Sequence, residues 1–181
     1  SHSHSAKNIT LTYILNKYRD EIVINKKSAP VEHYIIEGLL NSDLAALSLK
    51  TLKTYHVAKY RDERLKSVTG STVVRELSVL HQAFQVAINE WQVPIDNNPI
   101  SKVRSPTLNK PRERRLKDYE YHNLIKACAM SINPWLVPIV HIAIETAMRR
   151  GELLALNWQY VQLNARTCYL PITKNGSSRS L

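Results

Sequence analysis

Two cations with the chemistry to act on a phosphate lie where the C-terminal third of the chain changes direction. Arg149 separates an apolar stretch over 135–146 from a short helical turn that begins at Glu152. Lys174 precedes Asn175-Gly176, which has the strongest hairpin-turn chemistry in the sequence. A guanidinium can hold two phosphate oxygens at once, and a hairpin lysine can reach a neighbouring oxygen as a point charge or proton donor. Each alone is more often a surface cation, but the pair together indicates a phosphate site.

The net charge also favours a polyanionic partner. The 25 lysines and arginines against 15 acidic residues give a formal charge of +10. Between 102 and 117, two prolines and one acidic residue accompany seven cations, which are Lys102, Arg104, Lys110, Arg112, Arg114, Arg115 and Lys117. Because proline suppresses helix, we predict an extended linker whose cations can follow a phosphate backbone. A plain solvated hinge is the alternative.

Apolar spacing upstream of this linker predicts a small helical bundle. Helices are expected over 9–23, 32–40, 49–65 and 72–91, the last capped by Ser71 and followed by Pro94. Thr72 and Arg75 lie near the start of the fourth helix, on the side away from its apolar stripe. We therefore expect these two residues to face the polyanionic partner.

Downstream of the linker, the pattern predicts a mixed α/β region. Helices are expected over 119–130 and 135–146, the second largely buried, then a helical turn over 152–156. Strands over 160–163 and 167–172 should pair, with a third strand beginning at Arg179. The overall expectation is a mainly helical fold with a small antiparallel sheet.

Other features exclude several classes of protein. The two cysteines, Cys128 and Cys168, lack a metal or redox spacing, which favours a reduced cytoplasmic compartment and no metal site. The longest apolar run is far short of the roughly 20 residues that span a bilayer, so we expect no membrane association.

A family resemblance becomes specific at the two cations. Thr146-Ala147-Met148-Arg149-Arg150-Gly151-Glu152-Leu153, two expected strands, and Thr173-Lys174 followed by Arg179 resemble the start of the tyrosine recombinase (phage integrase) catalytic domain. The family pattern is Thr-Gly-x-Arg-x-x-Glu-Leu, then Thr-Lys-x-x-x-x-Arg, so Ala147 departs from the usual glycine. The segments 71–77, 87–91, 98–99 and 114–116 resemble the family's helical core-binding (SAM-like) domain and basic linker.

The resemblance implies a core-binding domain of four helices over 9–101, a basic linker over 102–117, and the N-terminal part of a catalytic domain over 118–181. Before them, serine and histidine alternate without periodic apolar residues, so 1–8 is expected to be a leader or tag remnant.

The resemblance also implies an enzyme that breaks and rejoins DNA through a 3′-phosphotyrosine, with no cofactor. Arg149 corresponds to the first catalytic arginine and Lys174 to the proton donor, while Glu152 matches an acidic position that orients an arginine. An ordinary helix-start carboxylate is the alternative for Glu152. The partner implied is double-stranded DNA, on which copies of the protein assemble as a dimer or tetramer. The expected DNA contacts come from Thr72, Arg75, Arg112, Arg114, Arg115 and Lys117.

The family's His-x-x-Arg motif and tyrosine nucleophile follow the hairpin, and these 181 residues contain neither. All nine tyrosines precede Lys174. We therefore expect this chain to bind DNA without cutting it, as part of a recombinase or as a truncated relative. A DNA-binding regulator that uses the helical bundle, or a helical protein-interaction module, are the other hypotheses.

Overall fold

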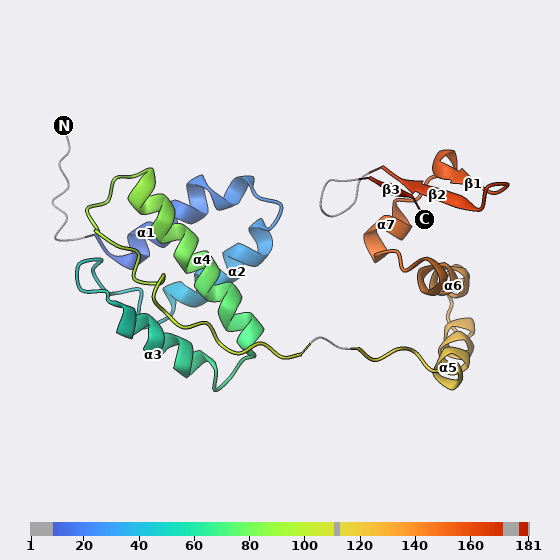
Figure 1. Cartoon of the computed structure of the whole chain (residues 1–181), viewed down its shortest axis with the longest axis horizontal. Helices are drawn as coiled ribbons and strands as arrows, with labels where there is room; N and C mark the ends of the chain where they lie inside the picture. Colours follow the sequence, from blue (N-terminus) through green and yellow to red (C-terminus); the bar gives the residue numbers. More distant parts are fainter. Residues whose placement is uncertain (1–8, 111–112, 172–177, 181) are drawn as a thin grey trace. The chain divides into compact units, whose positions relative to one another are not determined.

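The chain forms two compact units, Ser1–Pro111 and Arg112–Leu181 (Figure 1). The structure is a computed structural model that describes residues 9–110, 113–171 and 178–180. The mainly helical fold with a small antiparallel sheet is confirmed. The expected leader over 1–8 lies outside the described residues.

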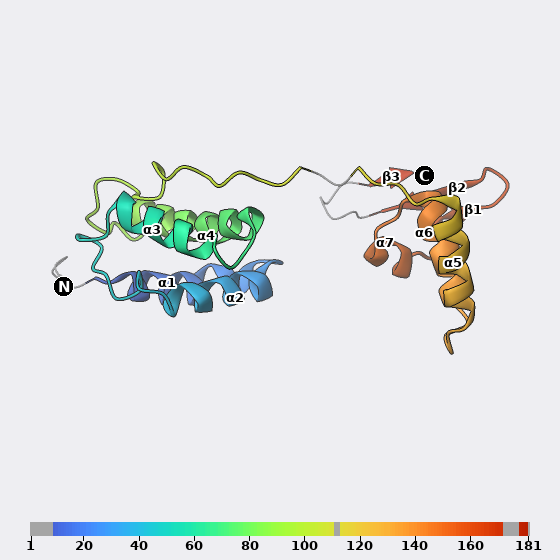
Figure 2. The ribbon, with the colours of Figure 1, turned by 90° about the horizontal axis from the view of Figure 1, so that it is seen from below.

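The first unit is helical. Its elements are α1 (Leu11–Glu21), the 3-10 turn η1 (Val23–Asn25), α2 (Ala29–Leu40), α3 (Thr54–Arg64) and α4 (Gly70–Asn89). Figure 2 shows α1 and α2 in one layer of this unit and α3 and α4 in the other. The helical spacing of the apolar residues gives each helix one face for the interior.

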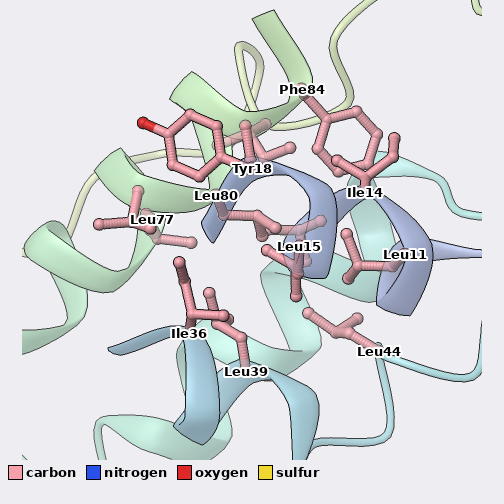
Figure 3. Close-up of a cluster of buried hydrophobic side chains, with 14 of the residues drawn as sticks. Leu11, Ile14, Leu15, Tyr18, Ile36, Leu39, Leu44, Leu77, Leu80 and Phe84 are labelled. Carbon is pink, nitrogen blue, oxygen red and sulfur yellow. The ribbon is translucent and has the colours of Figure 1, made fainter. Parts of the chain in front are cut away.

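The core of the first unit lies where α1, α2 and α4 meet (Figure 3). Tyr18 and Phe84 are the largest fully buried side chains. Around them, each helix contributes aliphatic residues from one of its faces, including Leu11, Ile14, Leu15, Ile36, Leu39, Leu77 and Leu80. This core rests on side chains three or four positions apart, which is the spacing on which the sequence prediction depended.

Several helix starts differ from the sequence prediction, and α2, expected from 32, already begins at Ala29. The helix expected over 49–65 begins only at Thr54, because Leu49 and Leu52 are buried without being helical. The Leu49 amide donates instead to the Ile9 carbonyl, at 2.9 Å. The fourth helix begins at Gly70 with Thr69 as its N-cap, so the expected cap at Ser71 is wrong.

The first part of the predicted linker packs against the helical unit. Arg61 of α3 donates from Nη1 to the Arg104 carbonyl at 2.8 Å. At Gly70, a Cβ would lie 2.6 Å from the Thr107 carbonyl oxygen, so only glycine permits this close approach. The backbone from 104 to 110 has no regular secondary structure, and the cations Lys102, Arg104 and Lys110 are exposed.

The second unit combines three helices with the sheet. Its elements are α5 (Asp118–Ala129), α6 (Leu136–Thr146), α7 (Arg150–Leu154), the 3-10 turn η2 (Trp158–Tyr160), β1 (Val161–Gln162), β2 (Thr167–Leu170) and β3 (Arg179–Ser180). The strands pair antiparallel in the order β1-β2-β3. Val161 is opposite Cys168, and Leu170 is opposite Arg179. Tyr160, expected in a strand, ends the 3-10 turn instead.

The expected burial of the helix over 135–146 is wrong. No residue of α6 is buried, and Ile142 and Ile144 are 42% and 40% exposed. Of the elements that the structure describes, α6 packs on α5 and α7, and these cover only part of an apolar circumference. On the α5 side, Tyr121 Oη and His141 Nδ1 form a 2.7 Å hydrogen bond.

Across the described ranges, no helix is long and apolar enough to cross a membrane. The same residues contain no cluster of three or more histidine, cysteine or acidic side chains that could hold a metal ion. Both cysteines are free thiols.

Candidate active-site and DNA-contact residues

Arg149 is positioned by the turn between α6 and α7. Ala147 ends α6 in the left-handed conformation, with φ of 51°, and the chain then leaves the helix direction. A residue with a Cβ pays roughly 1–2 kcal/mol for this conformation, which explains why the family pattern favours glycine there. Arg149 is extended, with φ −69° and ψ 148°, and is the N-cap of α7. The substitution at 147 therefore leaves Arg149 at the start of the helix.

Glu152 accepts two hydrogen bonds from Arg149. Its Oε2 accepts the Arg149 backbone N–H at 3.0 Å, and its Oε1 accepts a hydrogen bond from Arg149 Nη1 at 2.8 Å. The glutamate side chain is only 6% exposed. The Arg149 backbone hydrogen bond, then its guanidinium, hold the pKa of Glu152 below the ordinary glutamate value, and the charge of Arg179 adds to this effect. For Glu152, the sequence offered two alternatives, a carboxylate at a helix start or a residue that orients an arginine. The structure shows both, because Glu152 caps α7 and also forms the ion pair with Arg149.

The guanidinium of Arg149 remains accessible. Its side chain is 54% exposed, and Nη1 is its one nitrogen with a side-chain partner among the residues described. No other described residue forms an ion pair with this guanidinium, so its remaining donors can meet an anion, as gripping a phosphate requires. The proposed proton donor Lys174 lies outside the described residues.

Arg179 is a contact that the sequence reasoning missed. Its Nη2 donates to Glu152 Oε2 at 2.9 Å, from a strand 27 positions further along the chain. The only sequence signal for Arg179 was its match to the last arginine of the family's Thr-Lys-x-x-x-x-Arg pattern. The sequence analysis assigned no role to that arginine.

Thr72 and Arg75 are exposed on α4, facing away from the core as expected. Both line a cavity of about 670 Å³ between α2, α3 and α4, together with Tyr34 and Arg64. The structure thus brings these two predicted contacts together on one surface of the first unit.

A buried carboxylate, Glu76, also lines this cavity. Glu76 of α4 accepts hydrogen bonds from Arg64 Nε and Nη2 and from Tyr60 Oη, at 2.5–3.2 Å. Burial, followed by its hydrogen bond to Glu76, raises the pKa of Tyr60. The hydrogen bond to Glu76 likewise raises the pKa of Arg64. Sequence reasoning missed this cluster because its members come from two helices.

The linker cations differ in their surroundings. Arg114 forms an ion pair with Glu120, and Lys117 lies 5.9 Å from the Tyr119 ring centroid. Arg115 is exposed, and no ion pair links it to any residue described. Arg112 lies outside the described residues.

Solved structures share the fold of this chain. A lambda integrase dimer bound to a COC′ core site superimposes with a TM-score of 0.81 at 22% identity, covering 98% of this chain and 49% of that one. The Tn1549 transposon integrase in complex with a circular intermediate DNA gives a TM-score of 0.71 at 13% identity, covering 96% and 58%. The chain therefore has an integrase-like fold.

Sequence comparisons point to a family. Residues 114–181 match the phage integrase family. The shufflon-specific DNA recombinase of Escherichia coli is 35% identical over 97% of this chain and 47% of its own length. A putative integrase/recombinase of Haemophilus influenzae is 35% identical over 96% of this chain and 49% of its own length. These comparisons support the phage integrase family of tyrosine recombinases for this chain, which spans about half the length of the curated relatives.

Proposed function

We propose that this chain supplies the DNA-binding unit, the basic connector and part of the active site of a site-specific DNA recombinase. The observation that carries the proposal is the Arg149–Glu152 pair at the start of α7, inside the segment that matches the family. The helical unit over 9–101, the linker over 102–117 and the partial catalytic domain over 118–181 are the proposed functional divisions. The free cysteines support action in the reducing cytoplasm.

The proposed chemistry is attack on a DNA phosphate by a tyrosine that lies outside these residues. Arg149 would stabilise the charge that develops on the non-bridging oxygens, because an exposed guanidinium can donate to two of them. Lys174 would protonate the leaving 5′-oxygen. Glu152 would orient Arg149 and take no part in proton transfer. No step requires a metal or another cofactor.

The proposed partner is duplex DNA, bound as a dimer or tetramer of the protein. Thr72 and Arg75 would contact it from the first unit, and Arg112, Arg114, Arg115 and Lys117 from the linker. The solved lambda integrase structures include a dimer on a core site and a tetramer on a Holliday junction, which supports this proposal.

Salt dependence tests the binding. The affinity of the 181-residue chain for a fluorescent duplex should fall steeply with salt, by roughly 0.9 in the slope of log K against log salt for each phosphate neutralised. Replacing Arg112, Arg114 and Arg115 with alanine should lower that slope by roughly 2–3 units. An unchanged slope would make the linker a plain hinge.

The ion pair of Arg114 refines this test. A phosphate must compete with Glu120 for Arg114, whereas Arg115 carries no such ion pair within the described part of the linker. Glu120→Gln should therefore strengthen duplex binding, most clearly at low salt, and the gain should vanish when Arg114 is also alanine. A gain that persists without Arg114 would assign the effect of Glu120 to general charge alone.

Cleavage tests the chemistry, in the full natural gene product that contains this chain. Arg149→Ala should abolish strand cleavage and leave duplex binding within a few fold, because many other phosphate contacts remain. Arg149→Lys should restore little, since an ammonium cannot grip two oxygens. Lys174→Ala should slow cleavage less on DNA with a 5′-bridging sulfur, because a thiolate leaves without a proton. Binding without cleavage in the wild type would favour a DNA-binding regulator.

A further inference from the structure

One buried carboxylate is shared by two arginines from different elements of the second unit. Arg149 reaches Glu152 from the start of α7, and Arg179 reaches it from β3. We propose that Arg179 is a positioning residue for Arg149, acting through Glu152. The inference rests on the proposed function, in which Arg149 holds the scissile phosphate.

The two oxygens of the Glu152 carboxylate have different hydrogen-bond partners. Oε1 faces the Arg149 guanidinium at 2.8 Å, while Oε2 takes the Arg149 backbone N–H at 3.0 Å and Arg179 Nη2 at 2.9 Å. The backbone hydrogen bond alone leaves the carboxylate free to turn about its side-chain bonds. With Arg179 on the same oxygen, Oε1 stays directed at Arg149.

The sheet fixes the position of Arg179. Its backbone pairs with Leu170 of β2, which is 3% exposed, so the strand is held at a buried point. The Arg179 side chain is 37% exposed, and its Nε is buried with no hydrogen-bond partner among the residues described. An arginine that leaves a buried donor unsatisfied contributes little to stability by itself, which favours a role in placing Glu152.

The charges explain why two arginines serve one carboxylate. A single glutamate facing Arg149 alone would form a neutral pair and weaken the attraction of Arg149 for phosphate. With Arg179 present, the three side chains carry a net charge of +1, and the accessible side of the cluster is the 54% exposed Arg149. Arg179 therefore allows Glu152 to orient Arg149 without cancelling its charge.

Arg179 also follows Lys174 by five positions, so it has a second possible route of action. An effect through Lys174 would alter proton delivery to the leaving oxygen, whereas an effect through Arg149 would alter charge stabilisation on the non-bridging oxygens. Substrate analogues distinguish these two steps.

The first experiment uses the 181-residue chain and needs no catalysis. Carbon-13 NMR of the Glu152 carboxyl should show its pKa rising toward the ordinary glutamate value in Arg179→Gln, and the Arg149 Nε–Hε signal should shift or broaden. Arg179→Lys should restore much of both. The matched control is Arg166→Gln, which removes an exposed arginine of the β1–β2 turn. Unchanged Glu152 and Arg149 signals in a folded Arg179→Gln protein would overturn the proposal.

The second experiment measures cleavage by the full natural gene product. Arg179→Gln should slow cleavage by about 10- to 100-fold, by analogy with the groups that orient the ligands of a metal ion, with duplex binding unchanged. A neutral methylphosphonate at the scissile position should reduce that defect, because it carries less charge for Arg149 to stabilise. A 5′-bridging sulfur should leave the defect in place. Rescue by sulfur instead, or wild-type cleavage by Arg179→Gln, would refute action through Arg149.

The two levels of the proposal fail separately. If the wild-type protein does not cleave any DNA, the proposed function fails. If the wild type cleaves and Arg149→Ala does not, while Arg179→Gln matches Arg166→Gln, only the role of Arg179 fails. A melting temperature for each variant identifies any loss of fold.

Discussion

Replacing Glu76 with alanine removes the acceptor on which two side chains of α3 converge in the first unit. Glu76 is 6% exposed, and it receives Arg64 through two nitrogens and the hydroxyl of Tyr60. The alanine variant strands both donors and opens a space between α3 and α4. The free energy of unfolding of the first unit should therefore fall.

The structure sets the magnitude of this loss. A hydrogen bond to a charged group contributes about 1.5–3 kcal/mol, and two donors lose their acceptor. The Arg64 side chain is 36% exposed, so water can replace part of what it loses, and exposed ion pairs contribute only about 0–1 kcal/mol. Tyr60 is partly buried against the core, so water replaces less of what it loses and it bears more of the cost. We expect a total loss of about 2–3 kcal/mol.

Urea unfolding followed by Trp91 fluorescence measures the effect. Trp91 packs against the core of the first unit, so a background with Trp135→Phe and Trp158→Phe makes it the sole reporter. The transition midpoint should fall while the m-value stays constant. The control is Glu63→Ala. Glu63 forms an ion pair with Lys66, and the two side chains are 68% and 70% exposed.

Glu63→Ala should change stability by about 0.5 kcal/mol or less. The reasoning is refuted if Glu76→Ala unfolds at the same urea concentration as this control. Glu76→Gln separates charge from shape, because it keeps the size of the side chain and an acceptor oxygen. Its loss should be smaller than that of Glu76→Ala.

Two further predictions concern backbone packing and pH. Gly70→Ala should displace the segment at Thr107, because the new Cβ would lie 2.6 Å from a backbone oxygen, whereas Gly38→Ala, with no atom within 4 Å, should not. The amide NMR signal of Thr107 reports both variants, and equal signals would disprove the packing argument. Since the folded-state pKa of Glu152 is lowered, its stabilisation is complete above the ordinary glutamate pKa of about 4.3 and lost as pH falls through the lowered value. Thermal unfolding of the second unit should show this acid dependence, and Glu152→Gln should lack it.

Local sequence determined much of the first unit. The apolar residues of α1 and α4 recur every three or four positions, so their spacing alone predicts which face is buried. The fold class also followed from the sequence, since the helical patterns and the turn residues agreed. Helix ends were less predictable, because Leu49 and Leu52 satisfy the helical spacing yet are buried in a non-helical segment.

In the second unit, too, the sequence predicted one contact of the candidate site but not the surroundings of a neighbouring helix. Arg149 and Glu152 are three positions apart at a helix start, and this spacing by itself brings a carboxylate back to the N-cap. The sequence therefore contained both residues and the contact between them. The exposure of α6 was not predictable in this way, because an apolar sequence requires burial but does not name the element that provides it.

Only the tertiary structure joined Arg179 to Glu152, Arg64 and Tyr60 to Glu76, and the Thr107 carbonyl to Gly70. These pairs are 12 to 37 positions apart, and each depends on how one element packs on another. Helical periodicity fixes which side chains share a face, but a contact between two elements also needs their relative placement. That placement comes from burial of the whole apolar surface at once, so no local pattern encodes it.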